Sequence, residues 1–322
     1  MRYQPLGTSG LVVSSVGVGC NAFGKRIDQT ATTAVIDAAV DAGINFFDTA
    51  DSYGSGVSEQ MLGKALGTRR DQVVIATKFG MDTGGLYGED FGVRGSRGYI
   101  AKAVEGSLRR LGTDYIDLYQ LHTPDRVTPL EETLDALADL VTSGKVRYIG
   151  SSNMTAWEVV NADWLAESLG APHFITAQNE YSLYNRSAEA ELVPALETFG
   201  ISLLPYFPLA YGLLTGKYKR DQAPAEGTRL ATETFRYDGA DFDIVDGLQK
   251  FADDRGIPLL DVAIGGLLAQ PAVGSVISGA TRPEQINANV HAAQWDPSAE
   301  ELAELDDIVT PGTGKGYTTY AS

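Results

Sequence analysis

Short apolar runs alternate with longer segments of helical period along most of the chain, and this alternation strongly limits the available folds. In one longer segment, Ala31, Ala34, Val35 and Ala38 recur at the spacing of one helical face, and Gly43 follows it as a helix-ending glycine. Eight apolar runs are expected to be strands: residues 16–19, 45–48, 73–78, 115–122, 146–150, 174–178, 201–205 and 275–277. Helices are expected at residues 31–42, 58–66, 100–111, from Thr128 onward, 155–169, 187–199, 244–255, 258–270 and from Pro283 onward.

This order of elements predicts parallel strands joined by helical crossovers. Eight such units fit an α/β fold of the (β/α)8 TIM-barrel type, and a doubly wound open sheet is the alternative. Residues 3–6 and 11–13 predict a β-hairpin before the barrel, and the run Thr128-Pro129-Leu130-Glu131 predicts a capping box with proline at the first helical position. No linker, charge run or low-complexity tract divides the chain, so we expect a single domain over residues 1–322.

The composition narrows the partners and the compartment. A formal net charge of −17 argues against nucleic acid and anionic membranes, because both would be repelled. Cys20 is the single cysteine, so no intrachain disulfide can form, and the sequence contains neither a signal-peptide core nor a run of ~20 apolar residues. We therefore expect a cytoplasmic protein that acts on a small molecule, and the sequence leaves its oligomeric state open. No metal ligand is proposed.

Polar residues stand where several expected strands end. Asp48, Lys78 and His122 end three strands, and Tyr53 lies in the loop after Asp48. Because catalytic residues of such barrels gather at the carboxyl ends of the strands, we expect these four side chains to share one cavity. Each residue alone fits a salt bridge or a hydrogen-bonded histidine equally well, but their joint placement favours a catalytic site.

The four residue types suit proton transfer to a carbonyl oxygen. A free tyrosine has a pKa of ~10, and a nearby lysine ammonium would lower it. An aspartate would keep that lysine charged, and a histidine could orient the carbonyl by a hydrogen bond. None of these side chains supplies two electrons, so the pattern implies an external hydride donor.

Several short motifs together resemble the aldo-keto reductase family, in order, from about residue 1 to 310. The aspartate–tyrosine motif reads Phe47-Asp48-Thr49-Ala50-Asp51-Ser52-Tyr53-Gly54, the lysine strand Ala76-Thr77-Lys78, and the histidine strand Asp117-Leu118-Tyr119-Gln120-Leu121-His122. Further matches are Gly150-Ser151-Ser152-Asn153, Gln178-Asn179-Glu180-Tyr181, Tyr206-Phe207-Pro208-Leu209 and Gly212-Leu213-Leu214-Thr215-Gly216-Lys217-Tyr218. The pattern is similar to the branch that contains bacterial reductases and potassium-channel β-subunits.

The resemblance implies a role for each matching residue. Tyr53 would be the general acid, supported by Asp48 and Lys78, and His122 would orient the carbonyl. Ser152, Asn153 and Gln178 would hold the nicotinamide carboxamide, and Tyr206 would stack on its ring. The other implied cofactor contacts are Gly19, Cys20, Asn21 and Asp48 near the inner ribose; Phe207, Pro208, Leu209, Gly212, Leu214 and Lys217 near the pyrophosphate; and Ser278, Gly279, Thr281, Arg282, Gln285 and Asn289 near the adenosine phosphate and adenine.

Three positions depart from the family pattern. Phe207 replaces the common serine, Gly279 stands where one branch has a phosphate-binding lysine, and Thr281 occupies an often basic position, with Arg282 one residue later. Arg282 is the reason to expect NADP(H) as the preferred cofactor, because a cation at this place in an acidic chain suits a 2′-phosphate. NAD(H) stays an alternative. Phe23 and Phe79, which follow strand ends, are expected to line the substrate pocket with Tyr53 and His122.

Three functions are compatible with the pattern. The favoured one is an NADP-dependent aldo-keto reductase that reduces an aldehyde or ketone, including a sugar, to an alcohol. A Schiff-base lyase could instead use Lys78 as its nucleophile. A nicotinamide-binding redox-sensing module, as in the channel β-subunits, is the third.

Overall fold

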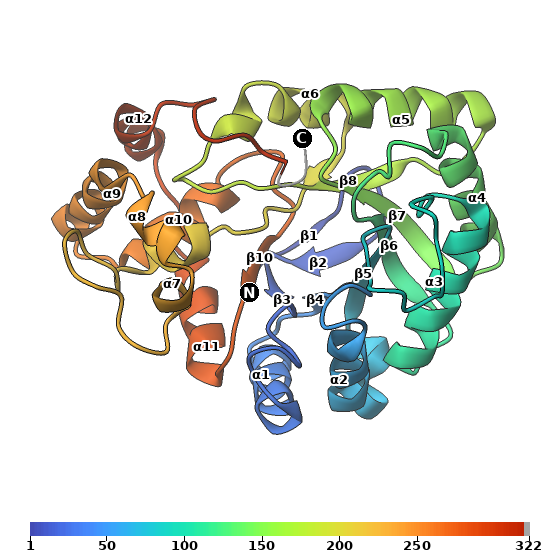
Figure 1. Cartoon of the computed structure of the whole chain (residues 1–322). Helices are drawn as coiled ribbons and strands as arrows, with labels where there is room; N and C mark the ends of the chain where they lie inside the picture. Colours follow the sequence, from blue (N-terminus) through green and yellow to red (C-terminus); the bar gives the residue numbers. More distant parts are fainter. Residues whose placement is uncertain (319–322) are drawn as a thin grey trace.

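The computed structural model describes residues 1–318, and within them eight parallel strands form one curled sheet (Figure 1). Its strands, in spatial order, are β10 (Val276–Gly279), β3 (Val16–Gly19), β4 (Phe46–Asp48), β5 (Val74–Phe79), β6 (Ile116–Leu121), β7 (Val146–Ser152), β8 (Phe174–Gln178) and β9 (Ser202–Leu203). All seven neighbouring pairs are parallel. The order follows the chain from β3 to β9 without the reversal of a doubly wound sheet, so that alternative is wrong.

The two edges of the sheet meet through the residues that precede β10. Leu203 of β9 donates its backbone N–H to the carbonyl of Ala272 at 2.7 Å, and Gly274 donates to the carbonyl of Leu203 at 2.9 Å. The segment that leads into β10 therefore bonds to the far edge strand. This curling is consistent with the expected (β/α)8 fold.

Helices follow the strands and surround the sheet (Figure 1). They are α1 (Gln29–Asp41), α2 (Val57–Leu66), α3 (Arg97–Leu111), α4 (Leu130–Thr142), α5 (Ala156–Leu169), α6 (Leu192–Phe199), α7 (Arg229–Thr232), α8 (Thr234–Asp238), α9 (Phe242–Arg255), α10 (Leu259–Leu268), α11 (Pro283–Ala292) and α12 (Ala299–Ile308). In α3 the expected apolar face is buried, Ser96 caps the first turn, and Gly112 ends the helix in the left-handed region. In the part of the chain that the structure describes, no helix has the length and apolar character needed to cross a bilayer.

The predicted capping box at Thr128 is wrong. Helix α4 begins at Leu130 with Pro129 in the N-cap position, and the Thr128 hydroxyl donates instead to Asp125 at 2.7 Å. The Asp125 carboxylate also accepts the backbone N–H groups of Val127 and Thr128, at 2.8 and 2.7 Å. Asp125 thus stabilises the turn before the helix, and because the Thr128 hydroxyl is bonded to Asp125 it does not cap α4.

The hairpin of β1 (Tyr3–Pro5) and β2 (Val12–Ser14) covers one end of the barrel interior. Leu6, Leu11 and Val13 form a small core with the inward side chains Phe46, Ala76, Leu118, Leu204 and Ile277. A Cβ on Gly17 would lie 2.7 Å from the ring of Phe46, so this glycine makes room for that ring inside the barrel. Along β5 and β6, Lys78 and Gln120 come two residues after Ala76 and Leu118, on the same strand faces and toward the open end.

Candidate active site

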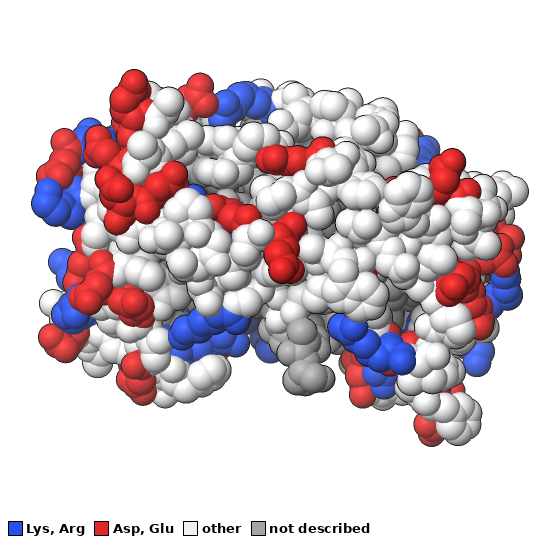
Figure 2. All heavy atoms as spheres, turned by 90° about the horizontal axis from the view of Figure 1, so that it is seen from above, with Lys and Arg blue, Asp and Glu red and all other residues white. Residues whose placement is uncertain are grey.

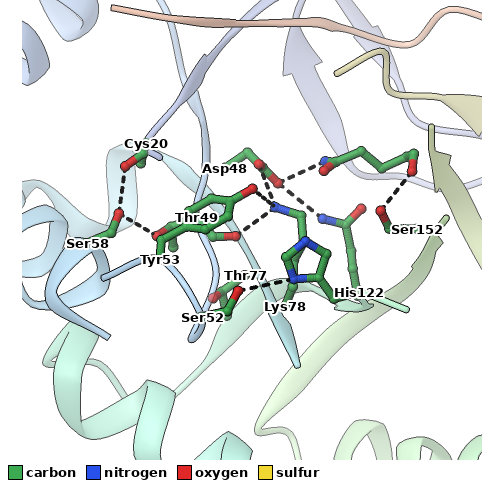
Figure 3. Close-up of polar contacts among 12 residues, drawn as sticks. Cys20, Asp48, Thr49, Ser52, Tyr53, Ser58, Thr77, Lys78, His122 and Ser152 are labelled. Carbon is green, nitrogen blue, oxygen red and sulfur yellow. Dashed lines mark hydrogen bonds and ion pairs between the residues drawn. The ribbon is translucent and has the colours of Figure 1, made fainter. Parts of the chain in front are cut away.

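Lys78 and Asp48 form a buried ion pair at the open end of the barrel (Figure 3). The Lys78 amine lies 2.7 Å from Asp48 Oδ2 and 2.8 Å from the carbonyl oxygen of Thr49, and its side chain is fully buried. Burial by itself would lower the pKa of Lys78, but the charge of Asp48 and the bonds to Asp48 and Tyr53 outweigh it, so the pKa is raised. Lys78 is therefore a cation held in the protein interior.

Two amides complete the surroundings of the Asp48 carboxylate. Gln120 and Gln178 each donate from Nε2 to Asp48 Oδ1, at 3.2 and 2.9 Å. Both oxygens of this buried carboxylate thus accept hydrogen bonds, one from the lysine and the other from the amides. This arrangement fixes the pair in one geometry, as a buried charge requires.

Tyr53 reaches the same ammonium group from the loop between β4 and α2. Lys78 Nζ lies 3.4 Å from the Tyr53 hydroxyl and 5.0 Å from the centre of its ring. The loop is tied to the sheet because the backbone N–H groups of Thr49 and Asp51 donate to the carbonyls of Ala76 and Lys78, at 2.9 and 3.2 Å. The lysine therefore contacts both the aspartate and the tyrosine.

His122 lies beside Tyr53, with ring centres 5.9 Å apart in an edge-to-face arrangement. Burial lowers the pKa of His122 well below its ordinary value, and the nearby Lys78 charge lowers it further, so the imidazole is neutral at physiological pH. Ser52 Oγ lies 3.4 Å from His122 Nδ1. In Figure 3 the other ring nitrogen is on the side of the ring toward Tyr53 and Lys78.

The structure thus brings together the four residues expected at one cavity. Asp48, Lys78 and His122 are almost fully buried, and Tyr53 is half-buried. A neutral imidazole, a phenol and a buried ammonium–carboxylate pair can together donate a proton to a polar ligand atom and stabilise the anion left behind.

The residues expected to hold a carboxamide form a connected group beside this cluster. Asn153 donates from Nδ2 to the carbonyl of His122 at 3.0 Å and accepts the Tyr206 hydroxyl at Oδ1 at 2.7 Å. Ser152 donates from Oγ to the carbonyl of Gln178 at 2.8 Å. Asn153 has a positive φ of 55°, a conformation that asparagine tolerates better than most residues.

The turn after β9 contains three non-glycine residues in the left-handed region. Phe207, Ala210 and Tyr211 have φ values of 53°, 45° and 60°. Such strain persists only where surrounding contacts impose it, and it clusters at functional loops. The Arg229 guanidinium stacks over the rings of Phe207 and Tyr211, at 5.2 and 4.9 Å.

Most backbone donors expected at a pyrophosphate are used inside this turn. The N–H groups of Gly212 and Leu214 both donate to the carbonyl of Leu209, at 2.8 and 3.2 Å. Lys217 is exposed, and its amine lies 3.4 Å from where a Cβ on Gly212 would stand. Pro208 is buried in the same turn. The cationic side chains at this turn are Lys217 and Arg229, and the Arg229 guanidinium also pairs with Glu233 at 2.9 Å.

The segment after β10 leads into the amino end of α11. Thr281 donates its N–H and hydroxyl to Gln285 Oε1 at 2.8 and 3.1 Å, and Asn289 is buried. Arg282 occupies the N-cap position with 69% of its side chain exposed, and its Nε is 3.9 Å from Glu284. Gly279 is exposed, while the buried Ser278 hydroxyl has no hydrogen-bond partner among residues 1–318.

The residues that follow β3 lie at the other side of Asp48. Cys20 donates its N–H to the Asp48 carbonyl at 2.8 Å, and Asn21 Oδ1 stands 3.6 Å from where a Cβ on Gly279 would lie. A Cβ on Gly19 would approach Ile277 to 3.2 Å. Burial raises the pKa of the Cys20 thiol, which leaves it unsuited to nucleophilic chemistry.

Phe23 and Phe79 are both fully buried in the larger core rather than open to a cavity. Phe79 stacks on Tyr119, with ring centres 4.8 Å apart. Both rings pack in the core beneath the site, and their expected contact with the substrate stays a prediction. In the described residues, 1–318, no group of three or more His, Cys, Asp or Glu side chains is arranged to hold a metal.

A comparison with models of protein families shows to which family this chain is related. Residues 15–310 match the model of the "Aldo/keto reductase family". The chain belongs to this family.

Individual aldo/keto reductases support the same assignment. The chain is 38% identical to a protein of Oryza sativa subsp. japonica named as a probable voltage-gated potassium channel subunit beta, over 96% of this chain and 97% of the relative. It is 38% identical to the uncharacterized oxidoreductase YrpG of Bacillus subtilis (strain 168), over 98% and 97% of the two chains. It is 35% identical to a versiconal hemiacetal acetate reductase of Aspergillus parasiticus, over 97% and 98%. Family membership and the oxidoreductase relatives support an oxidoreductase of carbonyl compounds.

Three contacts of this aldo/keto reductase site were missed by the sequence reasoning. Gln120 bonds to Asp48, Ser52 contacts His122, and Arg229 stacks on the turn after β9. Gln120 could have been found from its place two residues before His122, on the same face of one strand. The contacts of Ser52 and Arg229 depend on loop conformation, for which the sequence carries no regular spacing.

Proposed function

We propose that the protein is an NADP(H)-dependent oxidoreductase that reduces an aldehyde or ketone to an alcohol, with Tyr53 as general acid. The observation that carries the proposal is the Lys78 ammonium, which lies 2.7 Å from the Asp48 carboxylate and 3.4 Å from the Tyr53 hydroxyl. A cation in this place favours the phenolate that remains after Tyr53 has donated its proton. We also take the chain to act as one domain and to work in the cytoplasm.

The proton transfer is derived from the residues themselves. A carbonyl oxygen beside Tyr53 and His122 becomes an alkoxide as its carbon is reduced, and the Tyr53 hydroxyl donates a proton to it. The resulting phenolate faces Lys78, whose charge is retained because Asp48 accepts its hydrogen bond. No side chain of the cluster changes its oxidation state, so the two electrons come from a bound nicotinamide as hydride.

His122 is suited to orient the carbonyl as a neutral donor. A neutral imidazole carries one N–H and one acceptor nitrogen. A hydrogen bond from Ser52 Oγ to His122 Nδ1 would leave the proton on the other ring nitrogen, which is the one directed toward Tyr53 and Lys78 in Figure 3. That nitrogen could then donate to the substrate oxygen.

The chain's residues fit a nicotinamide dinucleotide at the expected places. The buried Ser278 hydroxyl is without a partner among residues 1–318, as expected of a group that awaits a ligand. Ser152, Asn153, Gln178 and Tyr206 would hold the nicotinamide end; Lys217 and Arg229 would face the phosphates. The preference for NADP(H) rests on Arg282, whose side chain is 69% exposed and only weakly engaged by Glu284.

Replacement of Tyr53 by phenylalanine tests the assignment. The variant keeps the ring and loses the proton donor, so kcat for NADPH-dependent reduction of aldehydes should fall by at least ~10²–10⁴-fold. The NADPH dissociation constant, measured by fluorescence, should stay close to that of the wild type. A variant with near-normal kcat would remove Tyr53 from the mechanism.

Two other functions compete with this proposal. A Schiff-base lyase needs a neutral amine, whereas the pKa of Lys78 is raised and its amine is fully engaged. The redox-sensing module is kept as an alternative because the rice relative is named as a probable voltage-gated potassium channel subunit beta. A screen of aldehydes, ketones and sugars with NADPH separates the reductase from the sensor. Rapid turnover supports the reductase, and tight NADPH binding without turnover supports the sensor.

A further inference from the structure

A second group of buried ionisable side chains lies behind the proposed catalytic cluster. Asp51 and Glu59 are both fully buried, and Asp51 is two residues before Tyr53 in the loop between β4 and α2. Arg110 of α3 donates from Nε to Glu59 at 2.7 Å and from Nη2 to the Tyr87 hydroxyl, also at 2.7 Å. Tyr87 in turn donates from its hydroxyl to Asp51 at 3.2 Å. The chain Glu59–Arg110–Tyr87–Asp51 is therefore continuous.

Tyr87 belongs to a long connection, residues 80–96, which we call the 80–96 loop. It joins β5 to α3 and contains no helix or strand, and such long irregular loops in compact domains are commonly functional. The loop starts next to the proposed site, because the N–H of His122 donates to the carbonyl of Phe79 at 2.8 Å. Ser55, in the loop of Tyr53, lies 3.4 Å from the carbonyl of Thr83. The two loops thus lie side by side.

The 80–96 loop is bonded to itself as well as to the barrel. Arg94 pairs with Asp90 at 2.8 Å and with Asp82 at 3.3 Å, so the two arms of the loop are joined. The Tyr87 ring packs edge-on against Tyr99, with ring centres 5.4 Å apart. A Cβ on Gly106 would lie 2.7 Å from the Tyr87 ring, which shows how closely this ring is held against α3.

The 80–96 loop thus has two polar contacts with the loop of Tyr53: Ser55 with the carbonyl of Thr83 at 3.4 Å, and the Tyr87 hydroxyl with Asp51 at 3.2 Å. The second of these joins the loop to the buried ionisable group. We propose that Asp51, Tyr87 and Arg110 are positioning residues that hold the 80–96 loop against the loop of Tyr53 and so set the affinity for the carbonyl substrate. The substrate part of this inference rests on the proposed reductase function. The attachment itself rests on the hydrogen bonds alone.

Substitution of Tyr87 by phenylalanine keeps the ring and removes both hydrogen bonds of the hydroxyl, the one donated to Asp51 and the one accepted from Arg110. Hydrogen exchange of residues 80–96 should become at least ~10-fold faster, because about 1.4 kcal/mol, the size of a single hydrogen bond, already corresponds to a factor of ten. KM for the carbonyl substrate should rise by a similar factor, with a much smaller change in kcat. The control is Tyr115→Phe, the same change of residue type, which loses the hydrogen bond to Asp71 at 3.1 Å immediately before β6, at the opposite end of the sheet.

A pair of substitutions at Asp51 separates positioning from general stability. Asp51→Asn keeps an oxygen that accepts from Tyr87 and should leave the exchange of residues 80–96 slow, whereas Asp51→Ala should accelerate it as Tyr87→Phe does. Unchanged exchange in Tyr87→Phe, or equal acceleration in Tyr115→Phe, would overturn the inference. Wild-type protein without NADPH turnover on any carbonyl would instead contradict the proposed function, and the exchange measurement would still decide the attachment.

Discussion

At the scale of single residues, the proposed site is organised around one buried cation. Lys78 has an oxygen partner on each side, Asp48 and Thr49, and the tyrosine hydroxyl at the longer distance of 3.4 Å. A lone buried ammonium would be driven toward its neutral form. Asp48 reverses that tendency, and the two amides on its other oxygen prevent the carboxylate from turning away.

The four central residues were predictable, and their partners were not. Asp48, Lys78 and His122 end or follow strands whose apolar pattern is visible in the sequence, and parallel strands bring such positions to one edge. Gln120 was passed over because an amide next to apolar residues carries no chemical signature of its own. Its role appears only once the register places β6 across from β5 and Asp48 within 3.2 Å.

Arg282 is the residue on which the cofactor preference depends. Its guanidinium is 69% exposed and 3.9 Å from Glu284, so surface pairing contributes little and the group is available to a 2′-phosphate. Charge-assisted hydrogen bonds of ~1.5–3 kcal/mol predict that Arg282→Ala lowers kcat/KM for NADPH by roughly 10-fold or more, with little change for NADH. The ratio of the two values is the measurement. Equal losses with both cofactors would mean that Arg282 does not read the phosphate.

At the scale of elements, periodicity predicted the strands and most helices within a few residues of their bounds. Residues 174–178 form β8 as expected, whereas the expected strand at 201–205 shortens to β9 over Ser202–Leu203. The sequence reasoning missed α12, although Ser298 and Glu301 form a capping box at its start, with hydrogen bonds of 2.8 and 3.2 Å. It also missed α7 and α8, which are too short for a periodic pattern to show.

The loop between β4 and α2 carries an acid in an environment that opposes its charge. Burial, and next the charge of Glu59, raise the pKa of Asp51 to about 8 from 3.8. The ionisable groups that face it are Glu59 from α2, Tyr87 from the 80–96 loop, Tyr99 and Arg110 from α3, and Tyr119 from β6. Asp51 Oδ1 has no hydrogen-bond partner among residues 1–318, so ionisation would leave a buried negative charge with one oxygen unbonded.

This environment predicts how Asp51→Asn changes the dependence of stability on pH. Between pH 3.8 and about 8, Asp51 is protonated in the folded protein and ionised in the unfolded chain. Wild-type stability therefore falls relative to the variant as pH rises through this window, by up to about 1.4 kcal/mol per pH unit, and the difference levels off above it. Urea unfolding of both proteins from pH 5 to 9 measures the difference. A constant difference across that range would show that Asp51 does not titrate there.

At the scale of the whole molecule, the surface is mainly acidic, and the cations expected to bind the cofactor are few and local. Asp and Glu side chains are spread widely over the face seen in Figure 2, and Lys and Arg form a few small groups between them. With a net charge of −17, the long-range field repels an anionic dinucleotide, so its binding depends on local cations. Lys217, Arg229 and Arg282 all lie in the segments after β9 and β10.

The β1–β2 hairpin, at the end of the barrel opposite the proposed site, should contribute to the free energy of unfolding without affecting catalysis. Leu6 is fully buried in the inner core with Phe46, Leu118 and Leu204, far along the strands from Lys78. Leu6→Ala leaves a cavity that the surrounding strands cannot easily close, so the unfolding free energy should drop by ~2–5 kcal/mol. Because β4 and β5 are fixed by their own ladder, kcat and KM should stay at wild-type values below the unfolding transition. Urea titration gives the first quantity and NADPH turnover the second; a large fall in kcat in fully folded Leu6→Ala would show that the hairpin also sets the geometry of the proposed site.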